Sequence, residues 1–220
     1  MTTRARSRPC AACGACTRSD EGAFATVKTV VRCPWAAKEP ELTYHDTEWG
    51  VPVREDRHLF ELITLEGAQA GLSWTTILRK REGYRRVFHD FDPTVVAAFD
   101  AAAIEAAVND PGIVRHRGKI VSTVGNASAF LAVQREHGSF SNYLWAFVDG
   151  KPRAGRYAAS AEVPATSALS EEVSRDLRKR GFRFVGSTIV QSFLQACGVR
   201  NDHRRTCFRA AEIAKLGRTT

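Results

Sequence analysis

Two pairs of cysteine and histidine, far apart in the sequence, constrain the fold of this chain more than any other feature. Eleven residues separate Cys33 from His45, and three separate His203 from Cys207. Two thiolates and two imidazoles form the tetrahedral ligand set that zinc favours in structural sites. One zinc ion bound by all four would close a loop of roughly 160 residues and so restrict the unfolded chain. The alternative is that the four residues are unrelated and that the cysteines are small buried apolar side chains.

The charge of the chain is positive and unevenly spread. The 220 residues carry a formal net charge of +8, and 44% of them are hydrophobic, which is enough for a real core in one large domain or two small ones. Residues 1–32 contain six basic and two acidic side chains, so they hold +4 and the remainder holds the other +4. In the remainder the basic residues are grouped, which suits contacts with phosphate, although most such groups are solvated surfaces. The groups are Arg79 to Arg81, Arg85 and Arg86, Arg115 to Lys119, and Arg178 to Arg180.

Three features that the sequence lacks indicate the cellular compartment of the protein. No run of eighteen apolar residues is present, so we expect no membrane-spanning helix and no membrane partner. The arginine-rich start lacks the apolar stretch of a secretory signal. The six cysteines show no regular pairing pattern, which fits a reducing compartment better than a disulfide framework. We therefore expect a cytoplasmic protein, and we expect it to be a monomer.

The first 31 residues differ in composition from the rest. Residues 1–31 are rich in Arg, Ser, Thr, Ala and Gly without periodicity, which predicts a disordered basic leader. Its three cysteines could form a second metal or iron–sulfur site, but they lack a nearby fourth ligand, which favours a segment without a cluster. These cysteines are Cys10, Cys13 and Cys16. We predict one folded domain over residues 32–208 and a C-terminal tail over residues 209–220.

From residue 56 onward the hydrophobic pattern is helical, and strand-like alternation is nearly absent. The later part of the chain predicts helices over residues 118–135, 170–180 and 186–197. The last of these is followed by Gly198, a residue type that ends helices. The sequence therefore predicts an all-α fold, a single bundle of helices with short connections. Polar residues with cap chemistry precede four of the predicted helices: Asp56, Ser73, Asp92 and Asp100.

Residues 110–119 predict a helix–hairpin–helix. One helix ends near Asp110, a Pro-Gly pair forms a tight turn, and a new helix begins among basic side chains. In this motif the turn glycines allow backbone N–H groups to approach a DNA phosphate, whatever the base sequence. The alternative is an ordinary corner between two helices with solvated Arg and Lys side chains. The candidate DNA-binding residues are Gly112, Arg115, Arg117, Gly118 and Lys119.

The segment Leu65–Trp74 carries the candidate chemistry. It places one carboxylate, Glu66, among small residues and starts a new helix at a serine cap with Trp74 just inside. Gly67 and Gly71 would each weaken a plain helix by about 1 kcal/mol relative to alanine, so we expect another reason for them, such as a ligand close to the backbone. A carboxylate beside an aromatic plane suits a flat, electron-poor heterocycle with exocyclic N–H groups.

Three further aromatic residues surround His45 in the sequence: Trp35, Tyr44 and Trp49. A metal bound at His45 would therefore also organise an aromatic wall. The alternative is that these side chains belong to the core, which is the usual place of a tryptophan.

Several long motifs occur in order along the chain. They are YHDTEWGVP from Tyr44, LEGAQAGLSW from Leu65, GIVRHRGKI from Gly112 and KRGFRFVG from Lys179, followed by QACG from Gln195 and NDH from Asn201. Together they resemble DNA-3-methyladenine glycosylase I, a family within the helix–hairpin–helix glycosylases. The resemblance covers residues 33–207 and leaves the leader and the C-terminal tail outside.

The resemblance implies a helix–hairpin–helix glycosylase fold in which one structural zinc ion per chain joins the N- and C-terminal segments. The implied partner is double-stranded DNA that contains alkylated bases. The implied reaction is hydrolysis of the N-glycosidic bond of 3-methyladenine, which releases the free base and leaves an abasic site after the nucleotide has been flipped out of the duplex. The zinc ligands would be Cys33, His45, His203 and Cys207.

The resemblance also implies roles for individual residues. Glu66 would be the catalytic residue that contacts the base, and Gly71 and Leu72 would occupy the gap left in the duplex, Leu72 as an apolar wedge. No lysine is placed for Schiff-base chemistry, so we expect no strand-cleaving lyase activity. The residues that would stack on the base, donate a hydrogen bond to it and line its walls are Trp74, Tyr44, Trp35 and Trp49.

Two other classes of function are open from the sequence. A non-catalytic helix–hairpin–helix module derived from a glycosylase would keep the hairpin and lose the chemistry, but the intact Leu65–Trp74 segment argues against it. A zinc hydrolase would need an open coordination position for a catalytic water, whereas four protein ligands give a closed site. The sequence thus favours a monofunctional base-excision glycosylase.

Overall fold

The computed structural model describes residues 30–219, and this part of the chain is all-α, as predicted. It contains ten α-helices, two short 3-10 helices and two strands of two residues each. The α-helices are α1 (Glu41–Thr47), α2 (Asp56–Gln69), α3 (Trp74–Val87), α4 (Pro93–Ala97), α5 (Ala101–Asn109), α6 (Arg117–His137), α7 (Phe140–Ala146), α8 (Ala168–Lys179), α9 (Ser187–Ala196) and α10 (Phe208–Thr219). The 3-10 helices are η1 (His89–Phe91) and η2 (Ser160–Glu162), and strands β1 (Arg153–Ala154) and β2 (Arg200–Asn201) pair in parallel.

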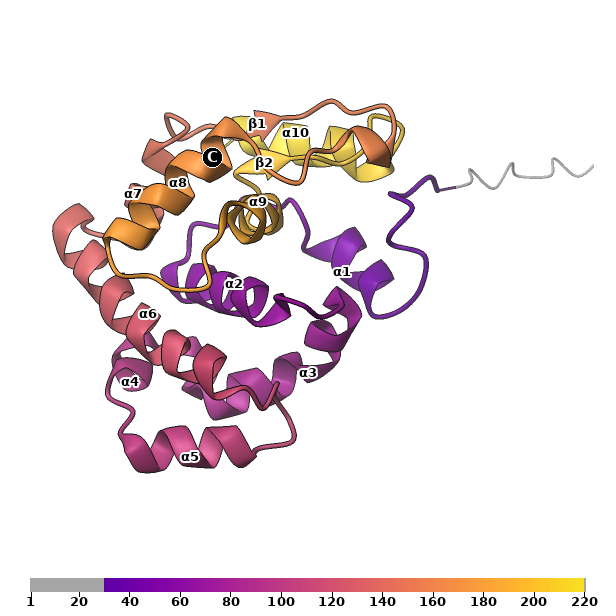
Figure 1. Cartoon of the computed structure of the whole chain (residues 1–220). Coiled ribbons are helices and arrows are strands. Elements are labelled where there is room, and N and C mark those ends of the chain that lie inside the picture. Colours follow the sequence, from indigo (N-terminus) through magenta and orange to yellow (C-terminus); the bar gives the residue numbers. More distant parts are fainter. Residues whose placement is uncertain (1–29, 220) are drawn as a thin grey trace, which may run out of the picture.

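Helix α2 lies at the centre of the molecule (Figure 1). Helices α3, α4 and α5 lie on one side of it with the start of α6, and α8, α9 and α10 lie on the other. Residues 59–68 of α2 are all buried, as expected of a helix that other elements cover on every side. A polar side chain on this stretch, such as Glu66, is therefore held in the interior of the protein.

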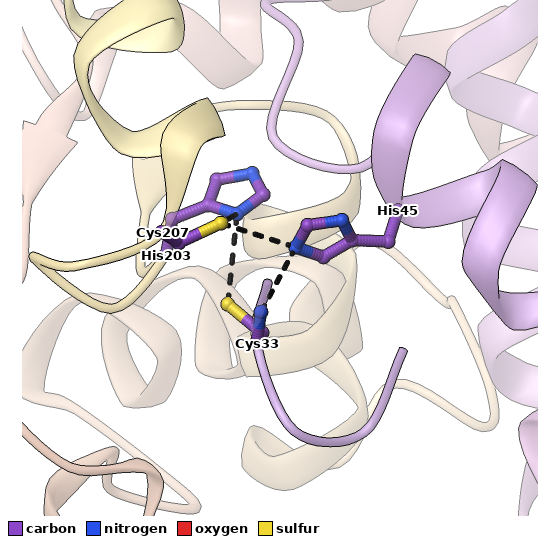
Figure 2. A group of neighbouring side chains, drawn as sticks. All are labelled: Cys33, His45, His203 and Cys207. Atoms are coloured by element: carbon purple, nitrogen blue, oxygen red, sulfur yellow. Dashed lines mark hydrogen bonds between the residues drawn. The ribbon is translucent and has the colours of Figure 1, made fainter. Parts of the chain in front are cut away.

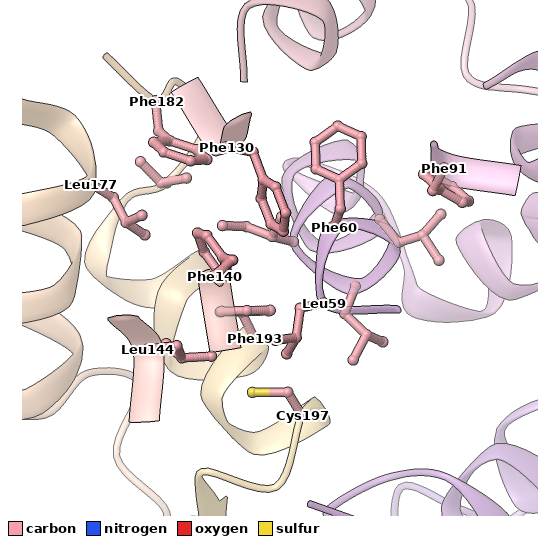
Figure 3. Close-up of a cluster of buried hydrophobic side chains, with 14 of the residues drawn as sticks. Leu59, Phe60, Phe91, Phe130, Phe140, Leu144, Leu177, Phe182, Phe193 and Cys197 are labelled. Atoms are coloured by element: carbon pink, nitrogen blue, oxygen red, sulfur yellow. The ribbon is translucent and has the colours of Figure 1, made fainter. Parts of the chain in front are cut away.

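Aromatic side chains fill the space between α2 and its neighbours (Figure 3). The ring centroid of Phe60 lies 5.1 Å from that of Phe130, which stacks on Phe140 at 4.2 Å. Phe193 of α9 is fully buried in the same cluster. Burying each such ring stabilises the fold by about 1.5–3 kcal/mol relative to leaving it exposed. This cluster holds α6, α7 and α9 against α2.

Local signals placed three helix starts and one helix end correctly. Ser73, Asp92 and Asp100 each accept a hydrogen bond from a backbone N–H in the first turn of the helix that follows. Gly198 follows α9 with φ +72°, a left-handed conformation that glycine adopts without strain. These predictions are confirmed.

The prediction that Asp56 caps α2 is wrong by one residue. Glu55 is the cap, because its carboxylate accepts hydrogen bonds from the amides of the first turn. Asp56 accepts instead from the N–H groups of Phe140 and Ser141, both at 2.8 Å. The Asp56 carboxylate thus caps α7 from outside and ties it to the start of α2.

Three helices have no clear signal in the hydrophobic pattern: α1, α7 and α10. The first two have seven residues each, too few for a period to show. Helix α10 occupies most of the segment predicted as a C-terminal tail, and its Ile213 is fully buried against the domain. Of the predicted leader, only residues 30 and 31 are described, so Cys10, Cys13 and Cys16 lie outside the described residues. Over residues 30–219 no helix is long and apolar enough to span a membrane.

Candidate functional site

The four residues of the two Cys/His pairs meet at one buried point (Figure 2). Cys33 precedes α1, His45 lies in α1, and His203 and Cys207 lie between β2 and α10. One possible ligand atom from each residue lies within 4.8 Å of those of the other three. The structure therefore brings together the start and the end of the described domain, as the spacing of the pairs predicts.

The spacing of these ligand atoms fits a tetrahedral metal site. The sulfur of Cys33 lies 3.7 Å from Nδ1 of His203, and the sulfur of Cys207 lies 3.6 Å from the same nitrogen. The Cys207 sulfur lies 3.4 Å from Nε2 of His45. A zinc ion with ordinary bonds to sulfur and nitrogen would separate its ligand atoms by about 3.6 Å. These four residues could therefore hold a metal ion.

The second ring nitrogen of each histidine is already hydrogen-bonded. Nδ1 of His45 donates to Asp46 at 2.8 Å, and Arg32 holds that carboxylate from the other side at 2.7 Å. Nε2 of His203 donates to the carbonyl of Trp49 at 3.0 Å. Each bond fixes the tautomer that directs the free lone pair of the ring toward the two sulfurs, as the outer partners of metal-bound histidines do.

The protonation of the two thiols also suits a metal. A hydrogen bond from Cys33 lowers the pKa of Cys207 well below its usual value. Cys207 is therefore a thiolate, which is the form of cysteine that binds metals. The same contact raises the pKa of Cys33, so one proton would leave when an ion binds.

The Cys/His cluster supports an aromatic wall, as the sequence predicts. The ring of Trp35 meets His45 edge-on at 5.2 Å and meets Trp49 at 5.0 Å. Trp49 in turn lies 4.5 Å from His203. Both tryptophans line a cleft on the other side of this wall. Loss of the cluster would therefore disturb the cleft as well as the chain ends.

The cleft has a volume of about 230 Å³ and lies between α1, the end of α2, the start of α3 and α9. All five residues proposed from the sequence to contact a base line it, together with four others. The predicted residues are Glu66, Tyr44, Trp74, Trp35 and Trp49, and the others are Glu41, Gln69, Ser192 and Gln195. Of these four, only Gln69 lies in a segment that the sequence singles out for chemistry, and the rest reach the cleft through tertiary packing.

Glu66 lies in this cleft without a polar partner. It is 5% exposed, and no hydrogen bond from any described residue reaches its carboxyl group. Burial raises its pKa to about 8, so at neutral pH the carboxyl group carries a proton while the cleft is empty. A cation in the cleft would reverse this effect, because an adjacent positive charge favours the carboxylate.

Two donors in the cleft are also unpaired. The hydroxyl of Tyr44 and the indole N–H of Trp74 are buried without a hydrogen-bond partner among the described residues. Their rings lie 5.4 Å apart. A buried polar group without a partner costs about 1–3 kcal/mol. Two such donors beside an unpaired carboxyl group indicate that a ligand completes this site.

The glycines of this segment have structural reasons that the sequence did not reveal. A Cβ on Gly67 would lie 3.3 Å from the side chain and carbonyl of Phe184, so this glycine lets the loop after α8 approach α2. No ligand is needed to explain it. Gly71 has φ +76° and open space around it, so the backbone conformation is what requires a glycine. Leu72 follows with its side chain 41% exposed.

The predicted hairpin connects α5 to α6. Ile113 is buried inside it, and a Cβ on Gly83 of α3 would lie 2.2 Å from the carbonyl of Gly112, so two glycines allow α3 to touch the hairpin. The amide of Gly112 donates to Asp110 at 2.7 Å. The first amides of α6 have no acceptors within the helix, and of these the amide of Lys119 donates to Nδ1 of His116, the cap residue of α6, at 3.2 Å.

The basic residues of the hairpin have different surroundings. Arg115 is exposed, as is the predicted DNA-binding glycine Gly118, and Arg117 forms an ion pair with Glu105. Lys119, in contrast, is buried, and its ammonium donates to the carbonyls of Ala68 and Ala70 at the end of α2. The structure thus places Lys119 against the segment Leu65–Trp74 and not on the predicted phosphate-binding surface.

Comparisons with known proteins agree on one family. Residues 35–210 match the family model described as methyladenine glycosylase. The chain is 48% identical over 177 residues to DNA-3-methyladenine glycosylase 1 of Escherichia coli (strain K12), covering 80% of this chain and 95% of the relative.

Solved structures extend this similarity to the fold. A crystal structure of 3-methyladenine DNA glycosylase I matches with a TM-score of 0.79 at 48% identity, over 81% of this chain and 98% of that one. A Staphylococcus aureus 3-methyladenine DNA glycosylase I, solved for the structural basis of 3-methyladenine recognition, matches with a TM-score of 0.78 at 39% identity, over 80% of this chain and 95% of that one. Sequence, fold and site agree, and the chain belongs to the methyladenine glycosylase family.

Proposed function

We propose that this protein is a base-excision DNA glycosylase that hydrolyses the N-glycosidic bond of 3-methyladenine in alkylated double-stranded DNA. The products would be the free base and an abasic site. The observation that carries the proposal is the buried, unpaired carboxyl group of Glu66 in an aromatic cleft with two unpaired donors. The names of its relatives support the same substrate. The proposal keeps the cytoplasmic location and the monomeric state expected from the sequence.

Recognition would depend on the charge of the base. Methylation at N3 makes adenine cationic, and a cationic ring beside Glu66 would lower the pKa of that carboxyl group and ionise it. The carboxylate would then accept a hydrogen bond from the exocyclic amine, while Trp74 stacks on the ring. Tyr44 would contribute a further hydrogen bond, and Trp35 and Trp49 would form the walls. The flipped base would thus supply the partners that the empty cleft lacks.

The same charge makes the bond easy to break. When the bond between C1′ and the base breaks, its electron pair moves onto the cationic ring, so the base leaves as a neutral molecule. Water then adds to C1′ and releases a proton. Little general-acid help is needed, which agrees with the lack of an aspartate after the hairpin, where Glu136 is the only acidic residue between Asp110 and Asp149. No lysine lines the described cleft, which supports a monofunctional enzyme without lyase activity.

The direct test is chromatography of the bases that the purified chain releases from dimethyl-sulfate-treated DNA. We expect 3-methyladenine and no release of unmodified adenine, whose bond is too strong for this site. We expect about a hundredfold less release of 7-methylguanine, because its O6 would face the Glu66 carboxylate where adenine presents an amine. Comparable yields of 7-methylguanine and 3-methyladenine would contradict the role of Glu66, and no released base at all would refute the function.

DNA binding would depend on phosphates and not on base sequence. The exposed start of α6 offers backbone amides, a helix N-terminus and the side chains of Arg115 and Arg117. We expect Arg115→Ala to weaken binding to all duplexes about equally and to reduce the slope of log affinity against log salt by about 0.9. The matched control is Lys151→Ala, an exposed cation in the loop between α7 and β1, which should leave the slope unchanged. Affinity that varies with the surrounding sequence would contradict this account.

We further propose that the Cys/His cluster holds one structural zinc ion. Cys33, His45, His203 and Cys207 would occupy all four tetrahedral positions, which leaves none for a catalytic water. The ion would join the segment before α1 to the segment before α10 and would support the wall formed by Trp35 and Trp49. Its role would therefore be stability and not chemistry.

A further inference from the structure

Lys119 follows the predicted phosphate-binding hairpin, but it is buried and its ammonium binds backbone carbonyls of the protein itself. It lies in the first turn of α6 and is 9% exposed. Its ammonium donates to the carbonyl of Ala68 at 2.8 Å and to that of Ala70 at 2.7 Å, and it forms no ion pair with any residue between 30 and 219. Burying an ammonium group is costly unless it gains specific hydrogen bonds. One bond goes to the last turn of α2, and the other goes to the connection between α2 and α3.

That connection is a type II turn. Ala70 has φ −44° and ψ 115°, Gly71 has φ +76°, and the amide of Leu72 donates to the carbonyl of Gln69 at 2.7 Å. A type I turn of the same four residues would differ mainly by a flip of the central peptide, which joins Ala70 to Gly71. Lys119 binds the oxygen of that peptide. Its ammonium therefore selects the type II form over the alternative.

The second bond of Lys119 completes the end of α2. The carbonyl of Ala68 would ordinarily accept from the amide four residues later, which belongs to Leu72. That amide is used inside the turn, so the carbonyl has no partner within the helix. Lys119 supplies the partner, and its positive charge lies at the negative end of the α2 dipole. One side chain thus fixes both the helix end and the turn that follows.

We propose that Lys119 is a positioning residue that couples the hairpin to the turn over residues 69–72, so that Leu72 is presented correctly to the gap left by the flipped nucleotide. The proposal rests on the proposed glycosylase function. Lys119 follows Arg117 and Gly118 in the chain, so the same turn of α6 that faces the DNA phosphates would hold the apolar wedge in place. Because of this rigid link, binding of the DNA phosphates at the start of α6 would also place Leu72 for insertion into the duplex.

The test compares base release from duplex and single-stranded methylated DNA. Single strands have no gap to fill, so the position of Leu72 matters only in the duplex. We expect Lys119→Met to lower 3-methyladenine release from duplex by on the order of tenfold to a hundredfold and to change release from single strands by less than about threefold. Binding of free 3-methyladenine, followed by tryptophan fluorescence, should be unchanged. The matched control Lys151→Met removes an exposed lysine between α7 and β1 and should leave both rates unchanged.

Two further variants keep the proposal testable if Lys119→Met is unstable. Gly71→Ala has room for its Cβ but opposes the positive φ, so it should give the same loss confined to duplex. Leu72→Ala should also do so, and combined with Lys119→Met it should cost little more than either change alone. Equal losses on both kinds of DNA, or additive losses in the double variant, would overturn the proposal. A parent protein that releases no base from either kind of DNA would refute the function instead.

Discussion

Glu66→Gln should lower the rate of 3-methyladenine release by about 10²–10³-fold while leaving the fold intact. The amide keeps the size of the carboxyl group but cannot become an anion beside a cationic base, so stabilisation of the charge is lost. Single-turnover release from methylated DNA measures this effect. The matched control is Glu41→Gln, which changes the other carboxylate that lines the cleft and is held by Thr75 at 2.6 Å. An unchanged excision rate in folded Glu66→Gln protein would refute the role of this residue.

The same substitution should stabilise the empty protein in a way that depends on pH. The pKa of Glu66 is raised from 4.5 to about 8 by burial. Below pH 4.5 the carboxyl group is protonated in both the folded and unfolded chains, so its contribution to stability is fully present. As the pH rises toward 8 the unfolded chain ionises and the folded one does not, and that stability is lost, by several kcal/mol if the shift is taken at about 1.4 kcal/mol per unit.

Melting curves at two pH values check this expectation. Glutamine does not titrate, so Glu66→Gln should melt at the same temperature as the parent near pH 4 and roughly 5 °C or more above it at pH 8. A difference between the two proteins that is the same at both pH values would contradict a buried, protonated Glu66. The gain in stability together with the loss of rate would identify a carboxyl group kept in the interior for binding and not for folding.

Loss of a proposed zinc ligand should have the largest effect on stability. We expect Cys33→Ser or His203→Ala to abolish bound zinc and to lower the melting temperature by more than about 10 °C, because metal binding energy contributes directly to folding energy. Elemental analysis should give one zinc ion per parent chain, and chelators should destabilise the parent but not the variants. The matched control is Cys197→Ala, since Cys197 is a buried cysteine outside the cluster, and this variant should retain its zinc. Zinc-free parent protein that melts like Cys33→Ser would show that the cluster is not a metal site.

The parts of the fold that were predictable from sequence are those with local causes. Ser73 and Asp100 cap their helices through amides three residues away, so the chain segment itself contains the signal. Asp56 has the same chemistry, but its partners lie more than seventy positions away, near the end of α6 and at the start of α7. The residue before it, Glu55, caps α2 instead. Local propensity could not distinguish these cases, because the tertiary contact decides between them.

The residues of the candidate site also divide into those with a local signal in the sequence and those without one. Glu66 and Trp74 were identifiable because they share one short segment with unusual glycines. Ser192 and Gln195 were not, because they come from α9 and reach the cleft only when that helix packs on α2. Lys119 was predicted at the surface because it belongs to a run of basic residues. Its partners are backbone carbonyls that exist as a pair only once the turn after α2 has formed.

The contact between Gly83 and Gly112 makes α3 a spacer of fixed length. Trp74 stands at the first position of this helix, and Gly83 touches the hairpin near the other end. Nine residues of helix set the distance between the cleft and the hairpin at about 14 Å. One inserted or deleted residue would not only change this length but also rotate Trp74 about the helix axis by about 100°. We therefore expect α3 to tolerate substitutions on its exposed face but not changes of length, even at positions that belong to neither the cleft nor the hairpin contact.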